Sequence, residues 1–323
     1  MSTPRLLIAV ITGGRPLLSD RPSRRLFSSL SSLGDIEYVV REDQASGYEP
    51  DPLAPLNVYP VSWADQYART HWRHPRATFQ PGGFHGAFTG REWAMRTAEE
   101  RGYDLVLQLD DNITEFGPID APRVHYFTDI IQPADSIRVM AEIALSTNLW
   151  MFGAQLSTVQ LKGSPPVARV GFPYSCFLEK TGPGRMPYYG PFEDDIMHAM
   201  EYGLNGGPGR TAGLTQAITY RKEPKSKTGM RAHYNAERGL ELVRRYPKNA
   251  RLRETVSSSS PTAKGTAVRH ILKTTGFTPI RVTDAERYAR ARADLSHLLS
   301  LCRDRLDERA REKIAKRAGR AES

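Results

Sequence analysis

The chain opens with a pattern of strand, helix and strand. Arg5–Ile11 reads as a buried strand, and a turn-rich segment, Thr12–Pro16, follows it. Apolar residues recur at helical spacing within Leu17–Leu33, and a second strand pattern lies at Asp35–Val40. This order of elements is typical of a parallel sheet with helices packed on its faces. We therefore predict an α/β fold, Rossmann-like, with a mostly parallel central sheet flanked by helices.

The middle of the chain continues this alternation. Thr89 and Glu92 fit a capping box, so we expect a helix that begins at Thr89, runs to about Arg101 and ends at Gly102. Asp104–Leu109 then predicts a strand. The periodicity also predicts strands at Trp150–Gln160 and Val167–Leu178, and helices at Asp135–Ser146, Asp195–Tyr202 and Ala236–Tyr246.

Residues 41–86 form the least regular part of the sequence. Closely spaced prolines interrupt every candidate element there, so we expect an irregular segment. A loop of this length in a compact domain commonly carries function. Its aromatic residues either line a pocket or form a small core of the segment itself; they are Tyr48, Tyr59, Trp63, Tyr67, Trp72, Phe79 and Phe84.

Charge is distributed unevenly along the chain, whose net formal charge is +9. Residues 1–220 have a net charge of −5, residues 221–273 of +10 and residues 281–323 of +4. The basic rear part suggests contact with a polyanion, and a solvated basic helix surface is the alternative.

The C-terminal part begins after a serine-rich stretch. Ser257–Ser260, followed by Pro261, has the composition of a linker, and Asp284–Ala318 beyond it is helical in pattern and highly charged. We therefore predict that residues 1–255 form the α/β domain. Residues 256–323 would form a Ser-rich linker and a basic helical extension.

The cysteines and the apolar runs limit the cellular setting. Only Cys176 and Cys302 occur, which excludes a disulfide framework and a cysteine zinc site and makes the reducing cytoplasm the expected location. The longest apolar run, Leu6–Thr12, is too short for a membrane span or a signal peptide. We expect no membrane partner, and the oligomeric state stays open.

Three polar residues, Asp110, Asp111 and Asn112, directly follow the predicted strand at Asp104–Leu109. In open α/β sheets, ligands bind at the carboxyl ends of the strands. Two carboxylates and an amide are hard oxygen ligands that suit Mg²⁺ or Mn²⁺, and a diphosphate would help to hold such an ion. We predict that these three residues bind a divalent metal; a simple polar turn is the alternative.

A second acidic cluster, Glu193-Asp194-Asp195, opens a predicted helix. Acidic residues in a first helical turn are expected from the helix dipole alone. Three in a row exceed what capping needs, and like charges this close raise one another's pKa, which suits a general base near neutral pH. Asp194 and Asp195 are therefore candidate catalytic residues, and a plain helix cap is the alternative.

Further residues are candidates for binding a nucleotide. The basic, glycine-containing segment 225–233 suits a loop that closes over a diphosphate, and its His233 is a candidate metal ligand. Polar residues that follow the first two strands, and Arg91 near the start of the capped helix, are expected at the same sheet edge. The candidates for binding the nucleotide donor are Thr12, Arg15, Glu42, Asp43, Arg91, Asp110, Lys225, Lys227 and Arg231.

The order of these motifs resembles that of a GT-A glycosyltransferase. The resemblance covers roughly residues 5–245, and its specific motifs are Gly90-Arg91-Glu92-Trp93-Ala94, Leu109-Asp110-Asp111-Asn112 and Phe192-Glu193-Asp194-Asp195. In that family a DxD-like motif holds a metal and a nucleotide-sugar, and a later ED motif opens a helix near the acceptor. Asn112 departs from the family, which often has a carboxylate there.

Within that superfamily the chain looks most like the TET-associated glycosyltransferases of bacteriophages, which glycosylate 5-hydroxymethylcytosine in phage DNA. The segments GREWAMRTAEERGYDLVLQLDDNI and FEDDI carry this narrower resemblance. It implies a GT-A-like domain that transfers a hexose from a nucleotide-sugar, with UDP-glucose the expected donor, onto modified duplex DNA. It also implies a divalent metal cofactor, Mn²⁺ or Mg²⁺, and the host cytoplasm as location. The alternatives are a GT-A enzyme with a carbohydrate or small-molecule acceptor, and a non-catalytic nucleic-acid-binding module.

Overall fold

The computed structural model describes residues 4–75, 77–119, 130–157, 167–223, 239–256 and 266–321, of which residues 254–256, 266–269 and 314–321 are described by their backbone alone. A mixed sheet forms the body of the protein. Its strands are β1 (Leu6–Ile11), β2 (Gly34–Arg41), β3 (Leu56–Tyr59), β4 (Leu105–Asp110), β5 (Ile113–Pro118), β6 (Leu149–Leu156), β7 (Arg169–Val170), β8 (Cys176–Lys180) and β9 (Thr211–Lys222).

Most strands of the sheet share one direction. The order is β3-β2-β1-β4-β8-β6-β9-β5, and β7 pairs with β9 outside this path. The pairs from β3 through β4 are parallel, and so is β6 with β9. Strand β8 runs antiparallel to β4 and β6, and β5 and β7 run antiparallel to β9. The predicted α/β class with a mostly parallel central sheet is confirmed.

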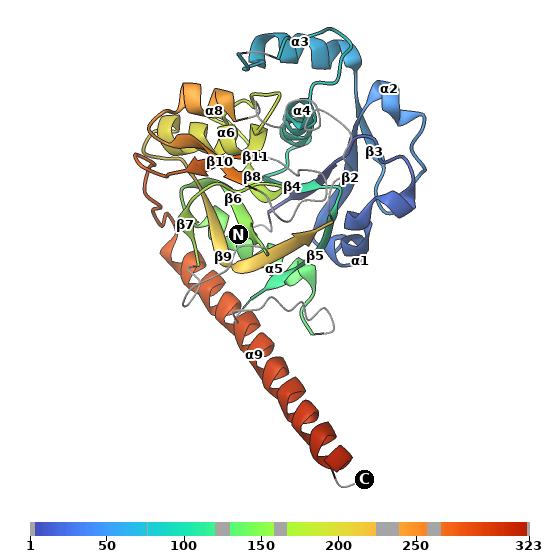
Figure 1. Ribbon diagram of the computed structural model, residues 1–323, viewed down its shortest axis with the longest axis vertical. Coiled ribbons are helices and arrows are strands. Elements are labelled where there is room, and N and C mark those ends of the chain that lie inside the picture. The colour runs from blue at the N-terminus through green and yellow to red at the C-terminus, as the bar shows by residue number, and fades with distance from the viewer. Residues whose placement is uncertain are drawn as a thin grey trace.

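Helices cover both faces of the sheet (Figure 1). Helices α3 (Val61–His71) and α4 (Ala87–Glu100) pack on one face, and α1 (Phe27–Leu30) and α5 (Pro133–Leu145) pack on the other. Alternate residues of β1 point to opposite faces of the sheet: Leu7 packs on the side of α4, and Ile8 packs on the side of α5. A strand buried on both sides needs a continuous apolar sequence, which explains the run that opens the chain.

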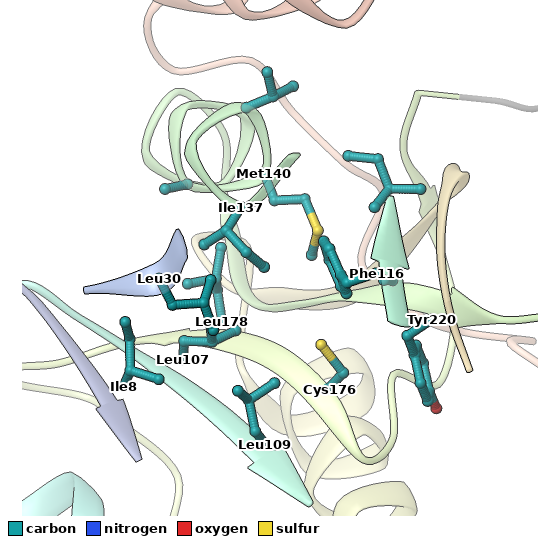
Figure 2. Packing of buried hydrophobic residues seen from close by; sticks show 14 of the residues in the cluster. Ile8, Leu30, Leu107, Leu109, Phe116, Ile137, Met140, Cys176, Leu178 and Tyr220 are labelled. Atoms are coloured by element: carbon teal, nitrogen blue, oxygen red, sulfur yellow. The ribbon is translucent and has the colours of Figure 1, made fainter. Parts of the chain in front are cut away.

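Figure 2 shows the cluster of buried hydrophobic residues that lies between the sheet and α5. Ile8, Leu107 and Leu178 of the sheet pack there with Ile137 and Met140 of α5. All five are at most 1% exposed. Burying each such side chain contributes about 1.5–3 kcal/mol, so β1, β4 and β8 are held firmly in register.

The C-terminal part adds further elements to the body of the protein and ends in a long helix. Helix α6 (Asp194–Met200) runs on into a π-helical turn, η3 (Glu201–Asn205), and the later elements are α8 (Leu240–Arg245), the hairpin β10 (Ala250–Val256) and β11 (Thr266–Leu272), and α9 (Ala285–Ala321). Helix α9 projects far from the body (Figure 1). Its first half packs on α5, where Leu295 and Cys302 join the core. The predicted C-terminal helical extension is therefore present.

The domain boundary predicted at residues 255 and 256 falls at the end of β10. The serine-rich stretch Ser257–Ser260 lies outside the described residues. The division into a domain at 1–255 and an extension at 256–323 stays a prediction. The helices within the described ranges include none that is long and apolar enough to cross a membrane.

Two predicted helices differ from the structure at their N-terminal parts. Leu17–Leu33 forms short pieces, η1 (Leu18–Asp20), η2 (Pro22–Leu26) and α1, because Pro22 has no N–H with which to extend a preceding helix. Helix α4 begins at Ala87, after Gly86 with φ 89°, so Thr89 lies inside the helix and the predicted capping box is wrong. The predicted stop is confirmed, since Gly102 adopts φ 71° just after the helix.

Residues 41–86 are more regular than predicted. They contain α2 (Glu42–Ala45), β3 and α3. Their prolines all lie outside these elements, and Pro60 is the N-cap of α3, where a missing N–H costs no helical hydrogen bond. The predicted strand at Val167–Leu178 divides into β7 and β8, whereas those at Asp35–Val40 and Asp104–Leu109 are confirmed within about one residue.

Candidate active site

A cleft of about 440 Å³ lies at the carboxyl ends of β1 and β4. Seven of the predicted site residues line it, although they come from four separate parts of the sequence. They are Thr12, Arg15, Arg91, Asp110, Asp111, Asp194 and Asp195. The cleft is therefore where the two acidic motifs of the sequence meet.

The register of β1 and β4 places the first acidic motif. Ile11 pairs with Asp110, so Thr12 lies beside Asp111 and its hydroxyl donates to Asp111 Oδ2 at 2.9 Å. Arg15 Nε lies 3.4 Å from Asp111 Oδ1. Lys222 Nζ lies 3.9 Å from Asp110 Oδ2. Asp110 and Asp111 are only 7% and 6% exposed. Because water reaches these two carboxylates only in part, the neighbouring cations and the Thr12 hydroxyl compensate their negative charges.

Asn112 has a different position. It is fully buried, does not line the cleft, and its amide donates to the backbone oxygen of Glu223 at 2.5 Å. The structure therefore does not bring Asn112 together with Asp110 and Asp111, because the chain turns between β4 and β5 and points this side chain inward.

Arg91 of α4 joins the two acidic motifs. Its Nη2 donates to Asp110 Oδ1 at 3.0 Å and its Nε to Asp194 Oδ2 at 2.8 Å. Arg91 is 2% exposed. Burial lowers the pKa of Arg91, but the carboxylates of Asp194 and Asp110 outweigh it, so the net shift is upward and the guanidinium stays charged. The sequence predicted a phosphate contact for Arg91; in the structure it holds two carboxylates in place.

Asp194 carries a shifted pKa. Burial raises the pKa of Asp194 to about 6, the Arg91 guanidinium opposes this shift, and the Asp195 and Asp110 carboxylates add to it. A carboxylate with such a pKa is ionised at neutral pH and still able to take up a proton. The sequence pointed to neighbouring like charges as the cause of a raised pKa; in the structure burial is the larger cause, and the Asp195 and Asp110 carboxylates add to it.

The backbone of Ser175 ties Asp195 to Asp110. Its oxygen accepts from the Asp110 N–H at 2.8 Å, and its N–H donates to Asp195 Oδ2 at 3.3 Å. Ser175 adopts φ 64° and Glu193, which precedes α6, adopts φ 51°. Left-handed backbone at a non-glycine residue costs about 1–3 kcal/mol and tends to occur at functional sites.

A buried polar network supports Arg91 from behind. Arg91 Nη1 donates to Gln108 Oε1 at 3.2 Å, and Gln108 Nε2 donates to Glu179 Oε2 at 3.1 Å. Glu179 also accepts from Tyr188 at 2.5 Å and Tyr202 at 2.9 Å, and it lies 2.7 Å from His198 Nε2 on α6. Because α6 also carries Asp194, the network closes a ring that runs through β8, β4, α4 and α6.

We predict that this network is a main source of stability. Replacing Glu179, which is fully buried, by Leu leaves several buried donors without an acceptor and should lower the free energy of unfolding by about 3–5 kcal/mol. Glu179→Gln keeps the shape and one acceptor oxygen, so its loss should be smaller. Urea unfolding followed by circular dichroism measures both. Glu286→Leu on the exposed start of α9 is the control, and a Glu179→Leu variant as stable as the wild type would contradict the prediction.

Other predicted donor contacts lie elsewhere. Glu42 accepts from the Val61 N–H at 3.3 Å, and Asp43 forms an ion pair with Arg41 at 2.7 Å, so neither lines the cleft. The next residue, Gln44, lines it instead, because α2 turns the chain by about 100° per residue. The remaining candidates lie outside the described residues; they are Lys225, Lys227, Arg231 and the predicted metal ligand His233.

The two aspartates fit a metal that is held in part by its substrate. Across the described residues, no three His, Cys, Asp or Glu side chains are grouped so as to hold an ion by themselves. Mg²⁺ is commonly bound through one or two carboxylates together with substrate phosphates. Asp110 and Asp111 are adjacent carboxylates on the wall of the cleft and therefore suit this mode.

Sequence reasoning did not identify Gln108, Glu179, Ser175 or Gln44 as parts of the site. A signal existed for the first two, since each is a polar residue inside an apolar strand sequence, LVLQLD and CFLEK. Phe84, which lines the cleft, was one of the aromatic residues for which a pocket was one of two interpretations.

No protein-family model matches the chain, and no curated protein sequence is similar to it. Solved structures are similar at low sequence identity. One is glucosyl-3-phosphoglycerate synthase from Mycobacterium tuberculosis in complex with Mn²⁺ and UDP-glucose, at 8% identity and a TM-score of 0.42, with 82% of this chain and 89% of that chain covered. A second structure of that enzyme, with Mg²⁺ and UDP, has 7% identity and a TM-score of 0.42, with 83% and 88% covered.

A mycobacterial protein is a further similar structure, at 9% identity and a TM-score of 0.39, with 83% of each chain covered. At such low identities and TM-scores, these likenesses carry no inference about the chemistry of the cleft. What the cleft can do follows from its own residues.

Proposed function

We propose that the chain is a glycosyltransferase of the GT-A type that uses a nucleotide-sugar, with UDP-glucose the expected donor. The observation that carries the proposal is the meeting of Asp110, Asp111 and Asp194 around Arg91 in one cleft at the carboxyl edge of the sheet. Ligands of open α/β sheets bind at this edge. The motif order seen in the sequence, which resembles the GT-A family, supports the same assignment.

Asp110 and Asp111 would hold Mn²⁺ or Mg²⁺ together with the diphosphate of the donor. When bound, the ion supplies positive charge that stabilises the departing nucleoside diphosphate. Thr12 and Arg15 orient Asp111 through the hydroxyl contact and the ion pair described above. Arg91 orients Asp110 in the same way and prevents the two acidic motifs from separating by repulsion.

Asp194 would be the general base of an inverting transfer, with Asp195 the other candidate. Its raised pKa, about 6, lets it accept a proton from an attacking hydroxyl at neutral pH. Its ion pair with Arg91 at 2.8 Å fixes the carboxylate in the cleft wall.

We further propose that the attacking hydroxyl is the hydroxymethyl group of 5-hydroxymethylcytosine in phage DNA, in the cytoplasm of the host. Support comes from the narrower family resemblance and from the net charge of +10 in residues 221–273. Part of this charge is paired, since Arg245 lies 2.6 Å from Glu201 and Arg221 lies 2.8 Å from Glu115. Arg251 and Arg253 of β10, however, are exposed and available to phosphates.

Salt dependence should reveal these phosphate contacts. Each contact releases counterions, so log affinity for duplex DNA should fall with log salt by about 0.9 per contact. Arg251→Glu should weaken binding to DNA and reduce the steepness of this slope by about 0.9, the value for one lost contact. Arg138→Glu, at an exposed position of α5, is the matched control and should change neither quantity. Fluorescence anisotropy at several salt concentrations measures both. A flat salt response in the wild type, or equal effects of the two variants, would argue against the DNA acceptor.

The acceptor is tested by the release of UDP from UDP-glucose in the presence of Mn²⁺. Turnover with hydroxymethylated duplex DNA, and not with unmodified DNA or without DNA, supports the full proposal. Turnover only with a carbohydrate or small-molecule acceptor keeps the glycosyltransferase and removes the DNA assignment. DNA binding without turnover on any acceptor points to a non-catalytic nucleic-acid-binding module.

A further inference from the structure

Phe84 is an exposed aromatic side chain on the wall of the cleft. It is 52% exposed, more than any other large hydrophobic residue within the described ranges. No other ring or cation of those ranges stacks on it. An aromatic face left open on the wall of a cleft that also holds polar groups is a place where a ligand can pack.

The loop that carries Phe84 is anchored on both sides of it. The Asp65 carboxylate accepts from the Gly82 N–H at 2.9 Å and lies 2.5 Å from His85 Nε2, and the Arg41 guanidinium donates to the backbone oxygen of Gly83. His85 itself is 2% exposed. The backbone on both sides of Phe84 is therefore held in place. A ligand that stacks on the ring does not have to order this loop, which keeps the entropic cost of binding low.

Gln44 supplies a hydrogen-bonding group beside the ring. A Cβ placed on Gly13 would lie 3.7 Å from Gln44 Oε1 and 3.9 Å from Phe84 Cε2, so both side chains lie over the same glycine at the end of β1. Across the parts of the chain that the structure describes, the Gln44 amide has no hydrogen-bond partner. A primary amide presents a donor and an acceptor side by side.

A flat apolar face next to a paired donor and acceptor suits a nucleobase. Bases stack on aromatic side chains, and their edges carry adjacent donors and acceptors that a glutamine amide can match. Thr12 and Arg15, which flank the Gly13–Gly14 turn, lead from this place to Asp111, where the diphosphate is proposed to bind. We infer that Phe84 and Gln44 form the subsite for the nucleobase of the donor, an inference that rests on the proposed function.

Calorimetric titration with nucleoside diphosphates in Mg²⁺ tests this subsite. Phe84→Leu should weaken UDP binding by about 10-fold or more, and Phe84→Trp should restore it, because stacking needs a flat ring. Gln44→Ala should narrow the differences in affinity among UDP, CDP, ADP and GDP, because it removes the groups that read the base edge. Pyrophosphate, which has no base, should bind all three variants as it binds the wild type. Leu53→Ala, exposed and outside the cleft, is the control.

The outcomes separate this inference from the proposed function. UDP binding that is unchanged in Phe84→Leu overturns the subsite alone. An equal loss of UDP and pyrophosphate affinity also overturns it, because the change would then act on the loop and not on the base. A raised KM for hydroxymethylated DNA with normal UDP affinity assigns the ring to the acceptor base and overturns it as well. A wild-type protein that binds none of the four nucleoside diphosphates removes the proposed function and the subsite together.

Discussion

Replacing Asp111 by Ala is expected to reduce hexose transfer by about 10³-fold, because the metal ion that would stabilise the leaving nucleoside diphosphate would lose one of its two carboxylate ligands. Asp110→Asn should reduce it similarly while keeping a hydrogen-bond acceptor for Arg91. The fold should tolerate Asp111→Ala better than Asp110→Ala. Asp110→Ala leaves the buried Arg91 with one carboxylate where it had two, at a cost of several kcal/mol.

Transfer of labelled hexose measures these losses, and thermal unfolding shows whether each variant is folded. Asp104→Ala is a matched control, since Asp104 lies just before the opposite end of β4 and accepts from the Arg5 N–H at 2.8 Å. Chelation of divalent ions should abolish transfer in the wild type, and Mn²⁺ should restore it. Full activity of Asp111→Ala, or of the wild type in excess chelator, would exclude the metal role.

Replacing Asp194 by Asn is expected to reduce turnover by about 10²-fold or more with little change in donor affinity, the range for loss of a positioned general base. The wild type should also lose activity below pH 6. The raised pKa of Asp194, about 6, means that protonation removes the base as the pH falls through that value. The decline should then be about tenfold per pH unit, and Asp194→Asn should lack this limb.

Rates across a pH series, with the donor Kd measured separately, test this role. Asp135→Asn is the matched control, because Asp135 also lies in the first turn of a helix, in a capping box on the far face of the sheet. A loss of turnover in Asp195→Asn alone would assign the general base to Asp195. Normal turnover in both variants would leave the cluster as a helix cap.

The sequence predicted β1, β2 and β4 and their carboxyl ends well, because largely apolar runs such as Leu6–Ile11 and Leu105–Asp110 admit little other than buried strands. It therefore also predicted where Asp110 and Asp111 lie. Helix starts were harder. Thr89 has the residue type of an N-cap, yet α4 begins before it, because packing against the sheet decides where a helix starts when several starts are locally possible.

The pairings inside the site could not be read from the sequence. Arg91 and Asp194 are far apart in the chain, and only the packing of α4 against α6 shows that the arginine binds carboxylates. Burial could not be read from the sequence either, since Asp110 and Asp111 follow a strand as residues of an exposed polar turn would, yet both are buried. Asp43 illustrates the same limit. Its carboxylate forms an ion pair with Arg41, and the next residue, Gln44, lines the cleft instead.

The most direct test of the whole account is the mass of the nucleosides recovered from hydroxymethylated duplex DNA after incubation with the protein, UDP-glucose and Mn²⁺. We predict that 5-hydroxymethyl-2′-deoxycytidine gains the mass of one hexosyl group, which is a hexose less one water, and that UDP is released in equal amount. Asp111→Ala should form about 10³-fold less of both products. Unchanged nucleosides, with no UDP released on any acceptor, would contradict the assignment of this cleft as a glycosyltransferase site.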